Sequence, residues 1–453
     1  MRNILEMVRP RILSFSFVTG LVLSLASSGA ANMMHSAATD SSGNIYTASG
    51  YPSNAKIRVS KRDASNTTAW VKDFNLPSPW TLVLKLPCVT CDGSGNTYVA
   101  ALIGRTGPNR QKIEIFKVSS TGTTVTTKLY DPVSSGGDIY LGGIVVDGTG
   151  NIYINGAYSP GGASTAYTPF VNKYNSTLST VSTNVMSFSG VGDYLVSDIA
   201  KDSSGNIYCA ESGYNTTTLA SFTAVFKYNS SFGLVSGWPA VDSYPPNQQL
   251  LGNAGNLHLN SAGTLVTYVT NGVDTLAGTT HIVAVQHSTS TAVTNWMASP
   301  TVNVSGLVAS LVDSSGDVVA VGPTATGYAI VKLSGSTGAT TWTTPVSSGL
   351  NNVPAGICQD LSGDYLTVYP YQPPASSNHY SAVDPISSGG TLGTQLLFGS
   401  SSANLDYGYA IFATSTSGTF VVSAVGYNTS AYYPLVYRQG SSPWYSYQTA
   451  TTP

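Results

Sequence analysis

The sequence predicts an all-β fold, an eight-bladed β-propeller of four-stranded antiparallel blades. Two observations support this prediction: a short phrase close to Asp-x-x-Gly-Asn-x-Tyr recurs along the chain, and a β-branched and aromatic run follows each copy. The spacing of the turn glycines averages (418 − 43)/7, about 54 residues, which is a period typical of solenoids and propellers. These glycines are Gly43, Gly95, Gly150, Gly205, Gly263, Gly316, Gly363 and Gly418.

The phrase has the chemistry of a tight turn between two strands. Its Asp side chain can accept hydrogen bonds from backbone N–H groups just downstream, and its Gly can adopt the positive φ that other residues resist. The copies at residues 40–46, 92–98, 147–153 and 202–208 are the strongest, and the later copies are partial. We therefore predict structural turns at Asp40, Gly43, Asp92, Gly95, Asp147, Gly150, Asp202, Gly205, Asp313, Gly316, Asp360 and Gly363.

A second hairpin follows each phrase, as at residues 224–233 and 329–342. Two hairpins give four strands, which is the content of one propeller blade. The strand before each turn is rich in small residues, and we expect it near the crowded axis. The Trp and Tyr residues of the later strands fit the wider rim.

The unbroken repeat predicts one domain, a single propeller over residues 32–453. Residues 1–31 allow two interpretations. Basic residues precede an apolar run at 15–25 and then small residues, which is the pattern of a signal peptide. The odd positions from Leu13 to Leu25 are also mostly apolar with serines between them, which is the pattern of a strand in a retained N-terminal arm.

The composition limits the classes of partner. Only 9% of the 453 residues are charged and the net charge is −2, so we expect neither nucleic acid nor an anionic membrane as a partner. The N-terminal apolar run is too short for a transmembrane span. A hydroxyl-rich chain of low charge resembles, in composition, exported adhesins and phage tail and fibre proteins.

The residues that usually carry chemistry are sparse. Cys88 and Cys91 have the CxxC spacing but lie at opposite faces of a predicted strand, which favours thiol packing over a metal or redox pair. The five histidines show no metal-binding spacing, and no disulfide framework is visible. We therefore predict no catalytic residues, no metal and no cofactor, and a protein that is not an enzyme.

The candidate binding residues lie in the links between the second and third strands of the repeats. These links vary in length and content, and variable loops on a rigid scaffold often bind partners, although solvated connectors are the simpler explanation for any single loop. Tyrosines there can stack on sugar rings or pack at protein interfaces, and the basic residues can meet an acidic partner. The candidates are Tyr158, Tyr167, Tyr369, Tyr371, Tyr380, Arg105 and Arg110.

The Asp-Ser-Ser-Gly-Asn-Ile-Tyr phrase resembles the SBBP-type and NHL-like repeats of exported bacterial propellers, over residues 38–453. This resemblance implies a propeller scaffold and no single activity. Hairpins that end in Trp70, Trp296 and Trp342 also look like quinoprotein repeats, but only in three repeats and without the adjacent cysteines of those dehydrogenases. A lyase or hydrolase site is a further alternative that would have to assemble across blades.

These observations predict a structural or adhesive propeller on an outer surface, most plausibly a phage virion or tail component that contacts other proteins of an assembly or a receptor. The predicted location is the virion surface or the extracellular space. The alternative is a bacterial propeller, secreted or periplasmic after signal cleavage, that binds glycans or, less plausibly, acts on them.

Overall fold

A computed structural model describes most of the chain between residues 37 and 447. The gaps are 41, 52–54, 65–66, 83–86, 106–109, 124, 133–136, 160–166, 187–191, 215–219, 246–247, 275, 278, 301–303, 305, 348–353, 373–379, 399–404, 414–419, 428–431 and 440–443. Residues 1–31, for which the sequence allows a signal peptide or an arm, lie outside the described residues, as does the turn at Gly418.

Every regular element in the described part of the chain is a β-strand, as the recurring β-branched and aromatic runs predict. The first half contains β1 (Ala37–Thr39), β2 (Ile45–Tyr51), β3 (Lys56–Arg62), β4 (Thr68–Asn75), β5 (Trp80–Leu82), β6 (Cys88–Cys91), β7 (Thr97–Arg105), β8 (Arg110–Val118), β9 (Val125–Tyr130), β10 (Ile139–Val146), β11 (Ile152–Tyr158), β12 (Thr168–Tyr174), β13 (Thr180–Val185), β14 (Gly192–Lys201), β15 (Ile207–Tyr214), β16 (Ser221–Tyr228) and β17 (Ala240–Ser243).

The second half continues in the same way, with hairpin following hairpin. It contains β18 (Gln248–Leu259), β19 (Leu265–Asp274), β20 (Thr279–Ser288), β21 (Thr294–Ala298), β22 (Ala309–Val312), β23 (Val318–Thr324), β24 (Gly327–Leu333), β25 (Thr340–Val346), β26 (Gly356–Gln359), β27 (Tyr365–Tyr371), β28 (Tyr380–Ile386), β29 (Leu396–Phe398), β30 (Leu405–Ala413), β31 (Phe420–Tyr427), β32 (Tyr432–Gln439) and β33 (Trp444–Tyr447).

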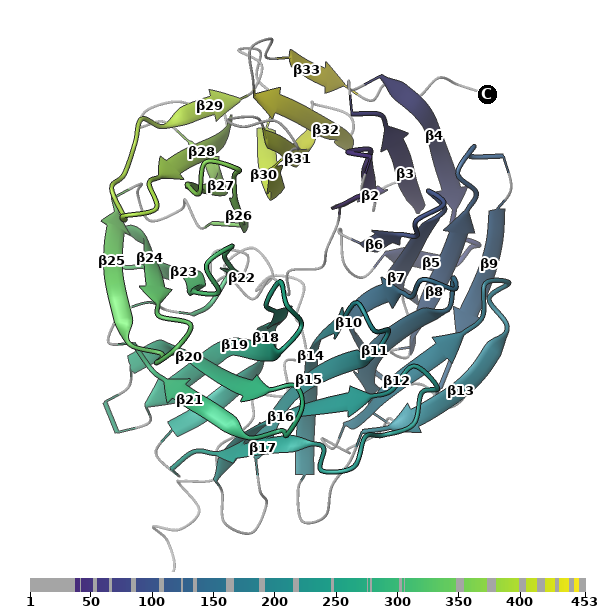
Figure 1. Ribbon diagram of the computed structural model, residues 1–453. Helices are drawn as coiled ribbons and strands as arrows, with labels where there is room; N and C mark the ends of the chain where they lie inside the picture. The colour runs from purple at the N-terminus through teal and green to yellow at the C-terminus, as the bar shows by residue number, and fades with distance from the viewer. Residues whose placement is uncertain are drawn as a thin grey trace, which may run out of the picture.

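The fold is an all-β propeller, with antiparallel sheets arranged around a common axis (Figure 1). The predicted count of eight four-stranded blades is wrong. Among the described residues, seven sheets are four-stranded blades: β1–β4, β10–β13, β14–β17, β18–β21, β22–β25, β26–β29 and β30–β33. The sheet β5–β9, which lies in the ring between β1–β4 and β10–β13, has five strands.

The fifth strand arises because the innermost strand of this sheet is interrupted. Both β5 and β6 pair with the same edge of β7, with Leu82 opposite Ile103 and Cys88 opposite Ala100. Five residues separate Leu82 from Cys88 in the sequence, whereas only two separate their partners, Ile103 and Ala100, on β7. In other sheets the same strand takes up single extra residues as bulges and stays whole, with one register shift in β10 and two in β14. The repeated phrase predicts the position of each turn. It does not predict the insertion in the strand before the turn, and the fifth strand could therefore not be predicted from it.

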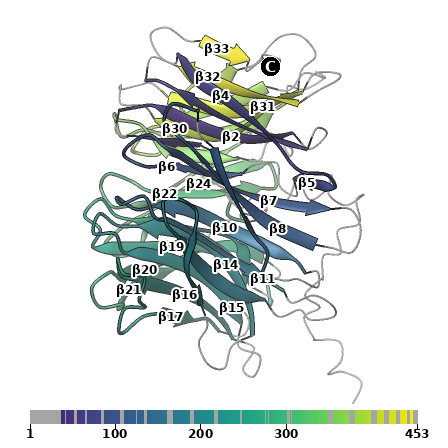
Figure 2. The same cartoon turned by 90° about the vertical axis from the view of Figure 1, so that its right-hand side faces the viewer.

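Each sheet has two distinct ends. At the turn end, the Asp-x-x-Gly turns join the first strand of a sheet to the second. At the loop end, the variable links join the second strand to the third. Figure 2 shows the ring from the side, with the strands running obliquely between the two ends. Because the strands alternate in direction, the second strand of every four-stranded sheet finishes at the loop end, as does β7 in the five-stranded sheet.

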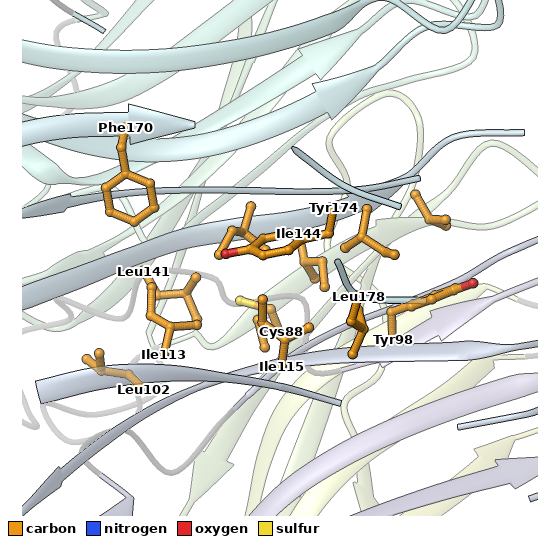
Figure 3. Close-up of a cluster of buried hydrophobic side chains, with 14 of the residues drawn as sticks. Cys88, Tyr98, Leu102, Ile113, Ile115, Leu141, Ile144, Phe170, Tyr174 and Leu178 are labelled. Atoms are coloured by element: carbon orange, nitrogen blue, oxygen red, sulfur yellow. The ribbon is translucent and has the colours of Figure 1, made fainter. Parts of the chain in front are cut away.

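The hydrophobic core is divided among the interfaces between neighbouring sheets. One cluster joins the five-stranded sheet to β10–β13, and Figure 3 shows Cys88, Ile113 and Ile115 of the first sheet facing Ile144 and other residues of the second. Similar clusters fill the other described interfaces. Alternate residues of a strand therefore serve different interfaces, because side chains alternate across a sheet.

Three outer-strand tryptophans tie each of their sheets to the next one. The indole Nε1–H of Trp296 on β21 donates to the backbone oxygen of Gly335, at 3.0 Å, and its ring lies against Gly338. Trp70 makes the same contact with Ser120 and Gly122, and Trp342 with Ser388 and Gly390. The tryptophan pattern that resembles quinoprotein repeats thus has a local structural role here.

Candidate ligand-binding face

The Asp residues of the turn end are fully engaged in local hydrogen bonds. Asp40 accepts from the backbone N–H of Ser42 and Asn44 through Oδ1, and from Asn44 Nδ2 and the Tyr46 hydroxyl through Oδ2, at 2.7–3.0 Å. Gly43 has a φ of 76°. Asp92, Asp147 and Asp202 likewise accept from the Asn four residues on and the Tyr six residues on. The carboxylate holds the turn and the following strand together.

The turn at Asp313 uses a tyrosine from the neighbouring sheet. Tyr365 donates its hydroxyl to Asp313 Oδ2 at 2.7 Å, and Lys332 lies 2.9 Å from the same oxygen. Tyr365 stands five residues after Asp360, whereas Tyr46 stands six after Asp40. A shift of one residue turns a strand side chain to the other face of its sheet, and Tyr365 therefore reaches the preceding sheet.

A hollow of about 300 Å³ lies at the turn end between β6, β10 and the end of β14, lined by residues that include Cys91, Asp92, Asp147 and Lys201. Its carboxylates already accept hydrogen bonds within their own turns. Burial, with the nearby carboxylates of Asp40 and Asp92, raises the pKa of the Cys91 thiol to about 12. A protonated thiol is a poor nucleophile and metal ligand.

The two cysteines of the CxxC segment serve different interfaces. Cys88 is buried in the cluster shared with β10–β13, whereas Cys91 packs against the cluster shared with β1–β4. The described cysteines, at positions 88, 91, 209 and 358, form no disulfide bond with one another. The expected opposite orientation of the pair is therefore present in the structure.

The loop end carries tyrosines at equivalent backbone positions. The second strand ends in tyrosine in five sheets, at Tyr51, Tyr158, Tyr214, Tyr371 and Tyr427. Sequence reasoning selected only two of these. The missed signal was a spacing, because 51 − 40, 158 − 147 and 371 − 360 all equal 11 residues from the turn Asp to the terminal Tyr.

Three of the predicted tyrosines come together in the sheet β26–β29. Tyr371 at the end of β27 is paired in register with Tyr380 at the start of β28, and both are partly exposed. Tyr369 stands edge-on to Tyr371, with ring centroids 6.3 Å apart. Tyr369 is itself fully buried, so it cannot contact a ligand at the surface as the sequence analysis expected. It lies on the same face of β27 as Tyr371 but two residues further from the loop end.

A buried polar network holds the Tyr369 ring in place. Asp384 is 3% exposed and accepts hydrogen bonds from the hydroxyls of Tyr328, on the preceding sheet, and Tyr369. The Tyr328 hydroxyl also lies 2.8 Å from that of Thr367, and Gln395 donates to the Tyr369 hydroxyl. Burial raises the pKa of the Asp384 carboxyl, although these hydrogen bonds oppose the shift.

The other two candidate tyrosines occupy the sheet β10–β13. Tyr158 is partly exposed and packs on Phe170, with ring centroids 6.1 Å apart. Tyr167 makes an edge-on contact with Tyr140 at 5.0 Å. Both are half-buried at the loop end, but neither lies beside the pair formed by Tyr371 and Tyr380, which belongs to another sheet.

Arg105 and Arg110 are directly paired across β7 and β8 at the loop end of the five-stranded sheet. The Arg105 guanidinium lies over the ring of Trp80, 5.8 Å from its centroid, and Lys112 lies 4.9 Å from the same centroid. Lys112 also pairs with Asp131 at 2.8 Å. Only the backbone position of Arg110 is described.

The described residues contain no group of three or more His, Cys, Asp or Glu side chains arranged to hold a metal ion. Within the same residues, no helix has the length and apolar character needed to cross a bilayer.

The fold and its two contrasting ends define a β-propeller, and structural comparison supports that class. The structure of the Dos1 propeller aligns with a TM-score of 0.50 at 10% identity, over 87% of this chain and 88% of that one. The dihydro-heme d1 dehydrogenase NirN, in complex with DHE, aligns with a TM-score of 0.52 at 10% identity, over 91% and 75% of the two chains. At this identity the likeness establishes the fold alone.

A comparison by sequence finds no matching family model and no matching curated protein. The similarity to SBBP and NHL repeats therefore stays a resemblance of the repeated phrase. The two structural neighbours include an enzyme, and the fold by itself decides neither for nor against catalysis.

Proposed function

We propose that this protein is a non-catalytic binding scaffold that contacts a glycan receptor through its loop end. The observation that carries the proposal is the pair formed by Tyr371 and Tyr380, two partly exposed aromatic side chains side by side at the end of one sheet. Tyrosine rings offer an apolar face for sugar rings together with a hydroxyl that remains solvated.

The pair is supported from below, which favours binding. Tyr371 packs against Tyr369, and Tyr369 is fixed by Asp384, Gln395 and the neighbouring sheet. A side chain that is already held in one orientation loses little conformational entropy when a ligand binds. This support distinguishes the pair from an isolated exposed tyrosine.

The chemistry around the pair favours neutral sugars. The carboxylate of Asp384, on the same strand as Tyr380, is buried and committed to hydrogen bonds with tyrosines. Stacking of an aromatic ring on the C–H face of a pyranose needs no charge, and the low overall charge of the chain agrees with a contact of this kind.

We further propose that the scaffold is displayed on an outer surface, as a phage virion or tail component. The low charge and the hydroxyl-rich composition support this placement. A secreted bacterial propeller is the alternative. Intact-mass measurement of the mature protein separates them, because loss of about the first 30 residues agrees with processing by a signal peptidase and argues against direct assembly into a particle.

A glycan array tests the binding function. The wild-type protein is expected to bind a set of neutral glycans, and the double variant Tyr371→Ala/Tyr380→Ala is expected to lose that binding by at least about tenfold, because stacked aromatic contacts contribute on the order of 1 kcal/mol each.

The matched control is Tyr371→Phe/Tyr380→Phe, which keeps both rings and removes both hydroxyls. This variant should keep most of the binding if ring stacking is responsible. An array without any bound glycan, or equal binding by the wild type and the alanine variant, would contradict the proposed function.

A further inference from the structure

We infer that the loop end of the five-stranded sheet holds a second subsite, which binds the carboxylate of an acidic sugar. The subsite is the Trp80 cluster, defined as Trp80, Arg105, Lys112 and Asp131. The inference rests on the proposed function, because it assigns to the glycan ligand a chemical group that the tyrosine pair does not recognise.

The additional strand builds the cluster. β5 pairs with the loop-end half of β7 and sets Trp80 directly opposite Arg105. Ile103, two residues before Arg105, is opposite Lys112 on β8. Residues two apart on a strand, and residues directly opposite across strands, share one face of the sheet. Trp80, Arg105 and Lys112 therefore project on the same side.

The indole ring positions both cations. The guanidinium carbon of Arg105 is 5.8 Å from the ring centroid of Trp80, and Nζ of Lys112 is 4.9 Å from it, within the range of cation–π attraction. Trp80 itself is partly buried against the cluster shared with β1–β4, so it is a fixed platform.

The charges of the cluster do not balance. Lys112 is compensated by Asp131, whose carboxylate lies 2.8 Å from its ammonium. Arg105 has no hydrogen-bond or ion-pair acceptor among the described residues, and its buried Nε–H is unsatisfied there. Two cations thus face one carboxylate, and the uncompensated one carries a donor that lacks an acceptor.

A carboxylate fits this arrangement best. Arg105 is partly exposed, and its guanidinium presents Nη–H donors in a planar fork that matches the two oxygens of a carboxylate. Lys112 adds positive charge beside it. Because the proposed function places glycan binding at this end of the molecule, we infer that the carboxylate belongs to an acidic sugar such as a uronic acid. An acidic peptide is the competing ligand and is treated as an outcome of the test.

Calorimetric titration can test the subsite with three probes: a glucuronate tetrasaccharide, a glucose tetrasaccharide and a tetraglutamate peptide. The full-length wild-type protein should bind the glucuronate at least about tenfold more tightly than the other two, and this preference should weaken as salt is raised. Arg105→Gln should abolish the preference, and Arg105→Lys, which keeps the charge without the fork, should retain part of it.

The control variant is Lys201→Gln, which removes one exposed positive charge at the turn end and should leave the preference intact. Circular dichroism and thermal melting verify that each variant is folded. The inference is overturned if Arg105→Gln retains the preference, if Lys201→Gln loses it equally, or if tetraglutamate binds as tightly as glucuronate. Failure of the proposed function shows separately, as absence of neutral-glycan binding that depends on Tyr371 and Tyr380.

Discussion

A single carboxylate organises each of the first four turns. The carboxylate oxygens of Asp147 accept hydrogen bonds from the backbone N–H groups and side chains of Thr149 and Asn151, and from the Tyr153 hydroxyl. The side chain thus links the turn to the second strand, and Tyr153 extends that link into the interface with the next sheet. This network explains why Asp, Asn and Tyr recur at fixed spacing in the first four copies of the phrase.

The Asp147 turn should make stability depend on acid pH. Burial alone would raise the pKa of Asp147, but its hydrogen bonds from Thr149 and Asn151 outweigh burial and lower the pKa from 3.8 to about 2. A lowered folded-state pKa means that the contribution is complete above about pH 4 and disappears as the pH falls through 2. Asp147→Asn should therefore lower the free energy of unfolding at pH 7 by about 1–3 kcal/mol. Urea unfolding from pH 7 to pH 2 measures the effect.

Asp360→Asn is the matched control, because Asp360 accepts from the backbone N–H groups of Ser362 and Asp364 and has no tyrosine donor. Its effect at pH 7 should be smaller. A difference between Asp147→Asn and the wild type that persists unchanged down to pH 2 would refute the role assigned to the Asp147 carboxylate.

At this scale the sequence allows the Asp and Gly residues to be predicted, because one turn chemistry demands both. The donor roles of Asn44 and Tyr46 were not predicted, since they depend on how the strand folds back over the turn. The burial of Tyr369 was also missed. Tyr369 and Tyr371 stand on the same face of β27, so the strand pattern does not distinguish them. Tyr369 is buried because it packs against Tyr328 of the preceding sheet, a contact that the sequence does not reveal.

The sheets are tied to one another by contacts between an outer-strand tryptophan and a turn of the next sheet. The Trp296 indole lies against Gly338, which adopts a φ of 70°. A Cβ at Gly338 would come within 2.7 Å of the indole ring. Glycine is therefore needed at this position both for its backbone conformation and for its lack of a side chain.

Gly338→Ala should be among the more damaging single changes at the rim. The positive φ alone costs a non-glycine residue about 1–2 kcal/mol, and the clash with Trp296 adds about 1–3 kcal/mol. Gly237→Ala is the control, because Gly237 has a φ of 86° and no atom within 4 Å of an added Cβ. Urea unfolding should show a clearly larger loss for Gly338→Ala, and equal losses would contradict the packing role of Trp296.

At the scale of the elements, the hairpins and their order follow from the repeated phrase and the runs after it. The five-stranded sheet does not, because the insertion at residues 83–87 lies in the strand that carries no phrase. Between Leu82 and Cys88 the chain has three more residues than β7 has between their two partners. The excess is the same within β18, where four residues separate Leu251 from Asn256 and one residue separates their partners, Asn271 and Val269. Yet β18 continues unbroken. Sequence length alone therefore cannot separate a bulge from an added strand.

The whole molecule has two ends with different chemistry. The described Asp residues of the turn end are committed to turns, with their oxygens already accepting hydrogen bonds. The loop end presents tyrosines at the ends of second strands and a pair of cations around Trp80. This asymmetry explains why we assign binding to the loop end and architecture to the turn end.

The sequence predicts the propeller class and the turn end well, because both follow from local chemistry repeated along the chain. It predicts the loop end only in part. Tyr371 and Tyr380 were selected as separate loop residues, and their direct pairing emerges from the register of β27 and β28. The cluster around Trp80 depends on β5, an element that the repeat does not encode.

The most direct test of the account is a calorimetric titration of a neutral glycan selected on the array against the wild type, Tyr371→Ala and Tyr371→Phe. We predict saturable binding by the wild type and Tyr371→Phe, and a loss of affinity of about fivefold for Tyr371→Ala with its melting temperature little changed. Equal affinity for all three proteins, or no saturable binding by the wild type, would contradict it.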